Sequence, residues 1–189
     1  MRTSSLLSIS QYNHCYLLGS HQMIKYLLLF LLPFAIFADE QRVLLTGFTI
    51  HEHDNDRFGE KYNAFNYGAG YEYTFFEKYN SLYFATNALL FNDSFKNPQL
   101  AVGFGHAYRF HTAFIDTSVG ISGFVGVKKI YTDEDLNRNG GEYGFTGGVG
   151  PTLNFYYKDF SVNFVYVPGF KYKDLDTTGF LFTYFGYRF

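Results

Sequence analysis

The sequence has no tryptophan, a single cysteine and few charged residues. One cysteine, Cys15, cannot close a disulfide within the chain, and it excludes a metal site built from several cysteines. Charged residues make up 17% of the 189 residues, and the formal net charge is −2. A chain this close to neutral lacks the basic surface that holds nucleic acid, so we expect no nucleic-acid partner.

Long hydrophobic runs are also scarce, because only residues 24–38 form one. That run is interrupted by Pro33 and is too short to cross a membrane comfortably as a helix, which takes about 20 residues. Lys25 gives it a basic start, and Ala38 ends it before two acidic residues. We therefore predict a signal peptide over residues 23–38.

Residues 1–22 precede this signal and are polar and irregular. We expect them to be an extension of the gene model, with Met23 as the true start. The alternative is an unusually long first region of the signal itself. Cys15 lies in this part, so we expect a mature chain without cysteine.

Aromatic residues and glycine are abundant, with 24 Phe, 18 Tyr and 19 Gly. This composition is typical of transmembrane β-barrels. From Gln41 onward the sequence shows no helical periodicity, and bulky residues alternate with small or polar ones in eight segments. The predicted strands span 41–51, 65–76, 81–92, 98–110, 113–127, 143–157, 160–170 and 178–189.

The connections between these segments alternate in length. Short turns are predicted at 77–80, 111–112 and 157–159, and longer polar loops at 52–64, 92–97, 128–142 and 171–177. Short turns at one end and long loops at the other are typical of outer-membrane barrels, whose long loops face the cell exterior. Residues 39–189 are therefore predicted to form one domain, an eight-stranded antiparallel transmembrane β-barrel of the bacterial outer membrane.

The last segment supports this prediction. Leu181, Phe185, Tyr187 and the terminal Phe189 share one face of the predicted strand. A strand that ends on Phe after aromatic residues at alternate positions resembles the closing strand of outer-membrane barrels. The resemblance implies that this strand serves as the assembly signal.

Alternation also assigns the two faces of each strand: bulky side chains should face lipid, and small or polar ones the interior. Inward glycines leave room for a pocket that opens to the outside, and they include Gly68, Gly70, Gly103 and Gly105. The alternative is that these glycines only ease the coiling of the strands. Inward charges should form a polar floor near the short turns, and they are Glu72, Arg109, Asp116 and Arg188.

Candidate catalytic side chains lie where two strands reach the outer rim. His51 ends the first strand, and Asp93 and Ser94 follow the third. Acyl transfer uses these residue types, because a hydroxyl attacks, an imidazole moves its proton and a carboxylate orients the imidazole. Spacing alone also allows the alternative that they are ordinary polar loop residues.

Four short motifs occur in the order and spacing of one family. They are Asp93-Ser94 followed by Gly103-Phe104-Gly105, Thr49-Ile50-His51, Tyr62-Asn63 ahead of the Gly68 and Gly70 run, and Tyr166-Val167-Pro168-Gly169. With them, residues 42–189 resemble the outer-membrane lipid A palmitoyltransferases, the PagP family.

The resemblance implies an enzyme that moves a palmitoyl-like chain from a phospholipid to lipid A, the lipid anchor of lipopolysaccharide, in the outer leaflet. It implies His51, Asp93 and Ser94 as catalytic residues, Gly105 as the glycine that sets the acyl-chain length, and lateral lipid access at Pro168. We expect the acyl pocket to be formed at Gly103, Gly105, Gly68 and Gly70. We expect the active rim to face the cell exterior. We also expect a monomer that needs no cofactor or metal.

The sequence departs from the family in several places. The family's N-terminal amphipathic helix is missing, and Ala64, Asn66 and His106 replace an acidic residue, a proline and a tryptophan. Two alternative functions stay open: a non-enzymatic barrel that binds a lipid or another hydrophobic ligand, and a lipid A deacylase.

Two alternative metal sites also stay open. His51, His53, Asp54 and Asp56 could bind a divalent cation. Residues 135–140 begin like a calcium loop, but Thr146 stands where the closing glutamate belongs.

The signal-peptide prediction can be checked directly. N-terminal sequencing of the exported protein should begin near Asp39, because the signal is removed after Ala38. A mature chain that retains residues 1–22 would contradict the prediction.

Overall fold

A computed structural model describes residues 38–55, 59, 61–76, 81–130, 141–172 and 175–189. Nearly all of the predicted signal peptide, residues 1–22 and the candidate calcium loop at 135–140 lie outside these residues. Among the described residues, no helix has the length and apolar character to cross a membrane.

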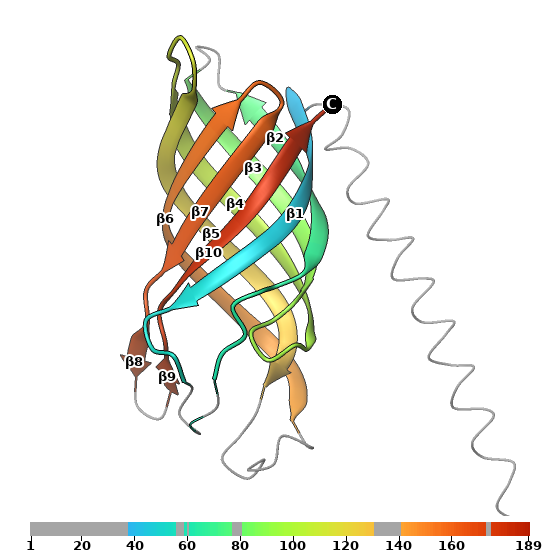
Figure 1. The fold of residues 1–189 in the computed structure, drawn as a ribbon, viewed down its shortest axis with the longest axis vertical. Coiled ribbons are helices and arrows are strands. Elements are labelled where there is room, and N and C mark those ends of the chain that lie inside the picture. Colours follow the sequence, from blue (N-terminus) through green and yellow to red (C-terminus); the bar gives the residue numbers. More distant parts are fainter. Residues whose placement is uncertain (1–37, 56–58, 60, 77–80, 131–140, 173–174) are drawn as a thin grey trace, which may run out of the picture. The chain divides into compact units, whose positions relative to one another are not determined.

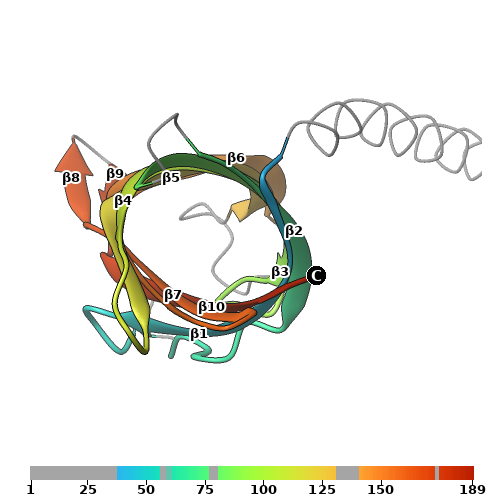
Figure 2. The same cartoon turned by 90° about the horizontal axis from the view of Figure 1, so that it is seen from above.

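Eight long strands pair into a closed antiparallel barrel, as predicted (Figures 1 and 2). Around the barrel the order is β1-β10-β7-β6-β5-β4-β3-β2. The strands are β1 (Glu40–His51), β2 (Gly68–Phe76), β3 (Leu82–Asn92), β4 (Pro98–Phe110), β5 (Asp116–Ile130), β6 (Glu142–Tyr157), β7 (Phe160–Val167) and β10 (Phe180–Arg188).

Two elements differ from the prediction. The segment 171–177, expected as a loop, contributes to a small two-stranded hairpin of β8 (Phe170–Tyr172) and β9 (Leu175–Thr177). Strand β5 runs to Ile130 rather than ending at residue 127. Alternation marks the membrane-facing part of a strand, but it does not show how far pairing continues beyond it.

The predicted alternation of faces is confirmed. On β4, Val102, Phe104 and Tyr108 are exposed on the outer surface, whereas Ala101 and Ala107 are buried. The apolar exterior is what a barrel surrounded by lipid requires, and closure leaves no unpaired strand edge.

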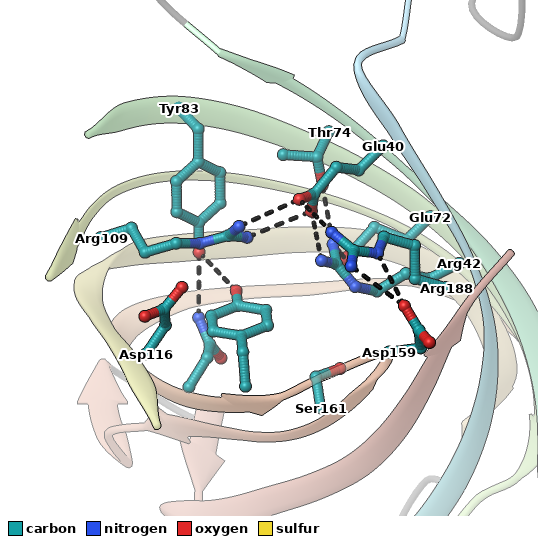
Figure 3. Close-up of polar contacts among 12 residues, drawn as sticks. Glu40, Arg42, Glu72, Thr74, Tyr83, Arg109, Asp116, Asp159, Ser161 and Arg188 are labelled. Atoms are coloured by element: carbon teal, nitrogen blue, oxygen red, sulfur yellow. Dashed lines mark hydrogen bonds and ion pairs between the residues drawn. The ribbon is translucent and has the colours of Figure 1, made fainter. Parts of the chain in front are cut away.

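The end of the barrel that holds the C-terminus is closed by charges, as predicted (Figure 3). The carboxylate of Glu40 accepts hydrogen bonds from Arg42, Arg109 and Arg188, with Nη1–Oε1 distances of 3.1 Å for the last two. Glu72 pairs with Arg42 at 3.4 Å. Glu40 is thus the shared partner of three guanidinium groups.

A hydrogen-bonded layer adjoins these charges. The Tyr83 hydroxyl lies 2.8 Å from both Ser118 Oγ and Tyr156 Oη, and Asn154 Nδ2 donates to Ser118 Oγ at 2.9 Å. Asp116 lies at this end of the barrel, as predicted: it lines a small cleft together with Arg109 and Arg188, and its Oδ2 lies 2.8 Å from His111 Nδ1 beside the short turn.

The opposite end of the barrel is less regular. The β1–β2 ladder ends at Leu45 and Ala69, and β1 is bulged between Thr46 and Thr49. Above that point segment 61–67 takes the place of β2, because Thr49 N donates to Ala64 O at 2.8 Å. The β6–β7 ladder ends at Thr152 and Val165, short of Pro168.

Loss of the floor's central carboxylate should destabilise the barrel. Glu40→Gln leaves three guanidinium groups without their shared anion, and we expect it to lower the free energy of unfolding by roughly 3 kcal/mol. The measurement is the temperature at which the folded, heat-modifiable gel band disappears. Asp159→Asn is the control, because this half-exposed partner of Arg188 should matter by less than about 1 kcal/mol. Equal effects of the two changes would contradict the assignment.

Candidate functional site

A cavity of about 500 Å³ occupies the barrel interior above the floor. Its walls are mainly apolar, and this volume lies in the range of small-molecule pockets. Apolar side chains from four strands contribute Leu89, Phe91, Phe124, Val165, Val167, Phe180 and Phe182. The predicted pocket is therefore present.

His51 and Ser94 meet at this cavity. His51 is the last residue of β1, and Ser94 lies in the turn that follows β3. The imidazole Nε2 is 2.7 Å from Ser94 Oγ. The ring stacks on Tyr62 with centroids 3.9 Å apart and planes 19° apart, and Phe180 lies against it at 5.9 Å. Aromatic packing therefore fixes the plane in which Nε2 meets the hydroxyl.

Asp93 lies beside this pair but bonds to its own turn. Its Oδ1 accepts hydrogen bonds from the amides of Phe95 at 2.9 Å and Asn97 at 2.8 Å. Lys96, in the same turn, has φ of 65°. This is an Asx-type turn, in which a carboxylate replaces a backbone acceptor. Asp93 thereby shapes the turn that presents Ser94.

Two buried polar atoms at this position have no hydrogen-bond partner among the described residues: His51 Nδ1 and Asp93 Oδ2. The orienting contact that a triad would place between carboxylate and imidazole is thus not formed in this structure. The imidazole Nδ1 can donate a hydrogen bond, whereas the carboxylate Oδ2 can only accept one.

Asn66 connects the two halves of the site. Its side chain is only 2% exposed. Thr49 Oγ1 donates to Asn66 Oδ1 at 2.7 Å, and Asn66 Nδ2 donates to the carbonyl of Asn92 at 2.9 Å. In the same segment Asn63 N donates to Ser94 O at 2.8 Å. The end of β1 and the turn after β3 are therefore joined although β2 separates these strands in the barrel.

No role for Asn66 or Tyr62 follows from the sequence alone, where Asn66 is only a departure from the family and Tyr62 only part of a motif. The one local signal for Asn66 is a polar residue between the exposed aromatic side chains of Phe65 and Tyr67. Its partners are distant in sequence, so its role required the fold.

The predicted pocket glycines fall into two groups. Gly103 and Gly105 line the cavity, and Pro168 lines it as well. A Cβ at Gly103 would meet Asn87 Oδ1 at 2.5 Å, and one at Gly105 would meet Ser122 Oγ at 2.9 Å. A polar side chain of a neighbouring strand therefore occupies the space beside each of these glycines.

Gly68 and Gly70 are not among the residues that line this cavity. A Cβ there would come within 2.3 Å and 2.2 Å of the carbonyl oxygens of Leu90 and Ala88. These two glycines allow close approach of β3 rather than enlarging the cavity.

Lys128, which was predicted to lie in a loop, also lines the cavity. Lys128 belongs to β5 and follows Phe124 and Gly126 on the inward face. Continuing the two-residue period past residue 127 would have found it.

The described residues contain no group of three or more His, Cys, Asp or Glu side chains that could hold a metal ion. Asp56, one candidate ligand, lies outside them, so the alternative site at 51–56 is described only in part.

Two solved structures have a similar backbone fold. The N-terminal barrel domain of Pseudomonas aeruginosa OprF is 14% identical, covers 80% of this chain and 98% of its own, and has a TM-score of 0.48. Neisserial surface protein A is 12% identical, covers 79% and 96%, and has a TM-score of 0.49. No curated protein matches the sequence.

One family model matches almost the whole described barrel. Its description is antimicrobial peptide resistance and lipid A acylation protein PagP, and the match spans residues 36–185. It contains His51, Asp93, Ser94, the cavity glycines and Pro168. The chain therefore belongs to the PagP family of lipid A acylation proteins.

Proposed function

We propose that this protein is an outer-membrane acyltransferase that moves a palmitoyl-like chain from a phospholipid to lipid A. The family's description as a lipid A acylation protein supports the reaction class. The observation that carries the proposal is the 2.7 Å contact between His51 Nε2 and Ser94 Oγ at an apolar cavity. A base, a hydroxyl and a space for a hydrocarbon chain are what transfer of a fatty acyl group needs.

The imidazole acts as general base through Nε2, so its other nitrogen carries the proton in the resting state. Nε2 takes the proton of Ser94 Oγ while that oxygen attacks the ester carbonyl of the donor. The acyl group is then on Ser94, and the lysophospholipid oxygen leaves with the proton from His51. A lipid A hydroxyl repeats the step in reverse: it gives its proton to Nε2 and takes the acyl group, and Ser94 recovers its hydrogen.

Asp93 has a positioning role in this reaction. Its Oδ1 holds the turn that carries Ser94. Catalytic contacts are often long in unliganded enzymes and tighten in the complex. A small closure of the turn on substrate binding would pair the free Asp93 Oδ2 with His51 Nδ1 and stabilise the imidazolium.

The substrates reach the site from the membrane. The acyl chain lies along the apolar wall, and its length is limited at the level of Gly103 and Gly105. Pro168 lies where the β6–β7 ladder has ended, which suits lateral access of a lipid. The site lies at the end of the barrel opposite the C-terminus (Figure 1), the end with the longer connections, so it faces the cell exterior.

Loss of either catalytic side chain should remove transfer while leaving the barrel intact. We expect His51→Ala and Ser94→Ala each to lower the rate by roughly 10²–10⁴-fold, because proton transfer or the nucleophile is lost. The refolded barrel is incubated with labelled phospholipid and lipid A, and acylated lipid A is measured by mass spectrometry. His53→Ala, on an exposed neighbouring residue, is the control.

The product identifies the function. Free fatty acid alone would indicate a deacylase, and no reaction at all would indicate a lipid-binding barrel. Activity that survives either alanine change, with the heat-modifiable band retained, would defeat the catalytic assignment.

The connection through Asn66 should affect the rate more than it affects folding. Asn66→Leu removes both side-chain hydrogen bonds, so His51 and Ser94 lose their fixed separation, and a displacement of this kind can cost about 100-fold in kcat. Asn66→Asp keeps the acceptor for Thr49 but loses the donor to Asn92, and it should fall between Leu and wild type. Full activity in Asn66→Leu would rule out the positioning role.

A further inference from the structure

The cavity contains one basic side chain, Lys128, that the proposed reaction does not use. Lys128 is the only lysine or arginine among the described residues that line the cavity. His51 and Asp93 line the same cavity near its mouth, and the cluster of arginines lies at the floor.

Strand register places Lys128 near the level of the catalytic turn. On β4, Gln99 pairs with Phe91 of β3, and the next residue, Leu100, pairs with Val127 of β5. Lys128 therefore lies one step further up, beside buried Gln99. Two strand spacings separate β3 from β5, so Lys128 starts roughly 10 Å around the wall from β3. Its flexible four-carbon stem spans much of that distance.

The ammonium group has no protein counter-ion in contact. Among the described side chains, none forms a hydrogen bond or ion pair with Lys128. Asp93 attracts it across the cavity, but Asp93 Oδ2 is itself unpaired. A half-buried cation without a contacting anion is unfavourable. An anionic group brought by a ligand would satisfy it.

We propose that Lys128 binds the phosphate of the donor phospholipid. This inference rests on the proposed acyl transfer. When the scissile ester reaches Ser94, only the glycerol backbone separates it from the phosphodiester. The phosphate then lies at the cavity mouth, where a lysine serves as a point charge for it. Lys128 thus selects glycerophospholipids over neutral esters as acyl donors, and it takes no part in the proton transfers.

The test compares a charged and a neutral donor. The refolded barrel is assayed with a phospholipid in the presence of lipid A, and with a neutral p-nitrophenyl ester of the same acyl chain. Lys128→Met keeps an unbranched stem and removes the charge, Lys128→Arg keeps the charge, and Lys129→Met is the matched control on the adjacent, outward-facing residue.

For Lys128→Met we expect KM for the phospholipid to rise about tenfold or more, since a charge-assisted hydrogen bond is lost. Hydrolysis of the neutral ester should change far less than the phospholipid reaction, and Lys128→Arg should restore most of the phospholipid activity. In wild type, a lysophospholipid should inhibit neutral-ester hydrolysis more strongly than the matching monoacylglycerol, and Lys128→Met should remove this difference.

Equal loss on both donors would overturn the proposal, because Lys128 would then act on the chemistry or on folding. An unchanged phospholipid KM would overturn it as well. If wild type acts on both donors and Lys128→Met has the same KM for the phospholipid as wild type, only this inference fails. If wild type acts on neither ester, the proposed function fails and takes the inference with it.

Discussion

The site depends on a connection between two strands that are not neighbours. His51 ends β1 and Ser94 follows β3, and β2 would normally keep them apart. Because the β1–β2 ladder stops at Leu45, segment 61–67 can enter between the two strands and bond to both. The buried amide of Asn66 makes this bridge with one acceptor and one donor. A buried amide satisfied on both sides can have few other positions, so it holds the end of β1 against the end of β3.

The barrel is built differently at its two ends, and this difference gives it a direction. At the C-terminal end, one carboxylate of Glu40 gathers three guanidinium groups, with a layer of hydroxyls and an amide beside them. Buried charges of this kind hold one another in place, because separating any of them leaves an uncompensated charge. At the other end the ladders stop early, and apolar walls enclose free space. The free space therefore lies toward the end that carries His51 and Ser94.

Much of the fold follows from period two alone. Bulky and small residues alternate because one face meets lipid and the other the interior, so the strands and their facing could be predicted residue by residue. Prediction failed where side chains respond to partners rather than to the membrane. The hairpin of β8 and β9 forms where a loop was expected. Lys128 was left in a loop because its charge interrupts the apolar pattern, although its position continues the inward face.

The sequence by itself determined that this chain forms an eight-stranded barrel, with an apolar exterior, a pocket and three candidate catalytic residues at one rim. Those features depend on local alternation and on short motifs, which can be recognised without knowledge of the tertiary contacts. Only the tertiary structure decided that His51 meets Ser94, that Asp93 bonds to its own turn, and that Asn66 and Tyr62 support the pair. These contacts join residues that are mostly distant along the chain. Closure of the barrel sets their distances, and no local pattern encodes them.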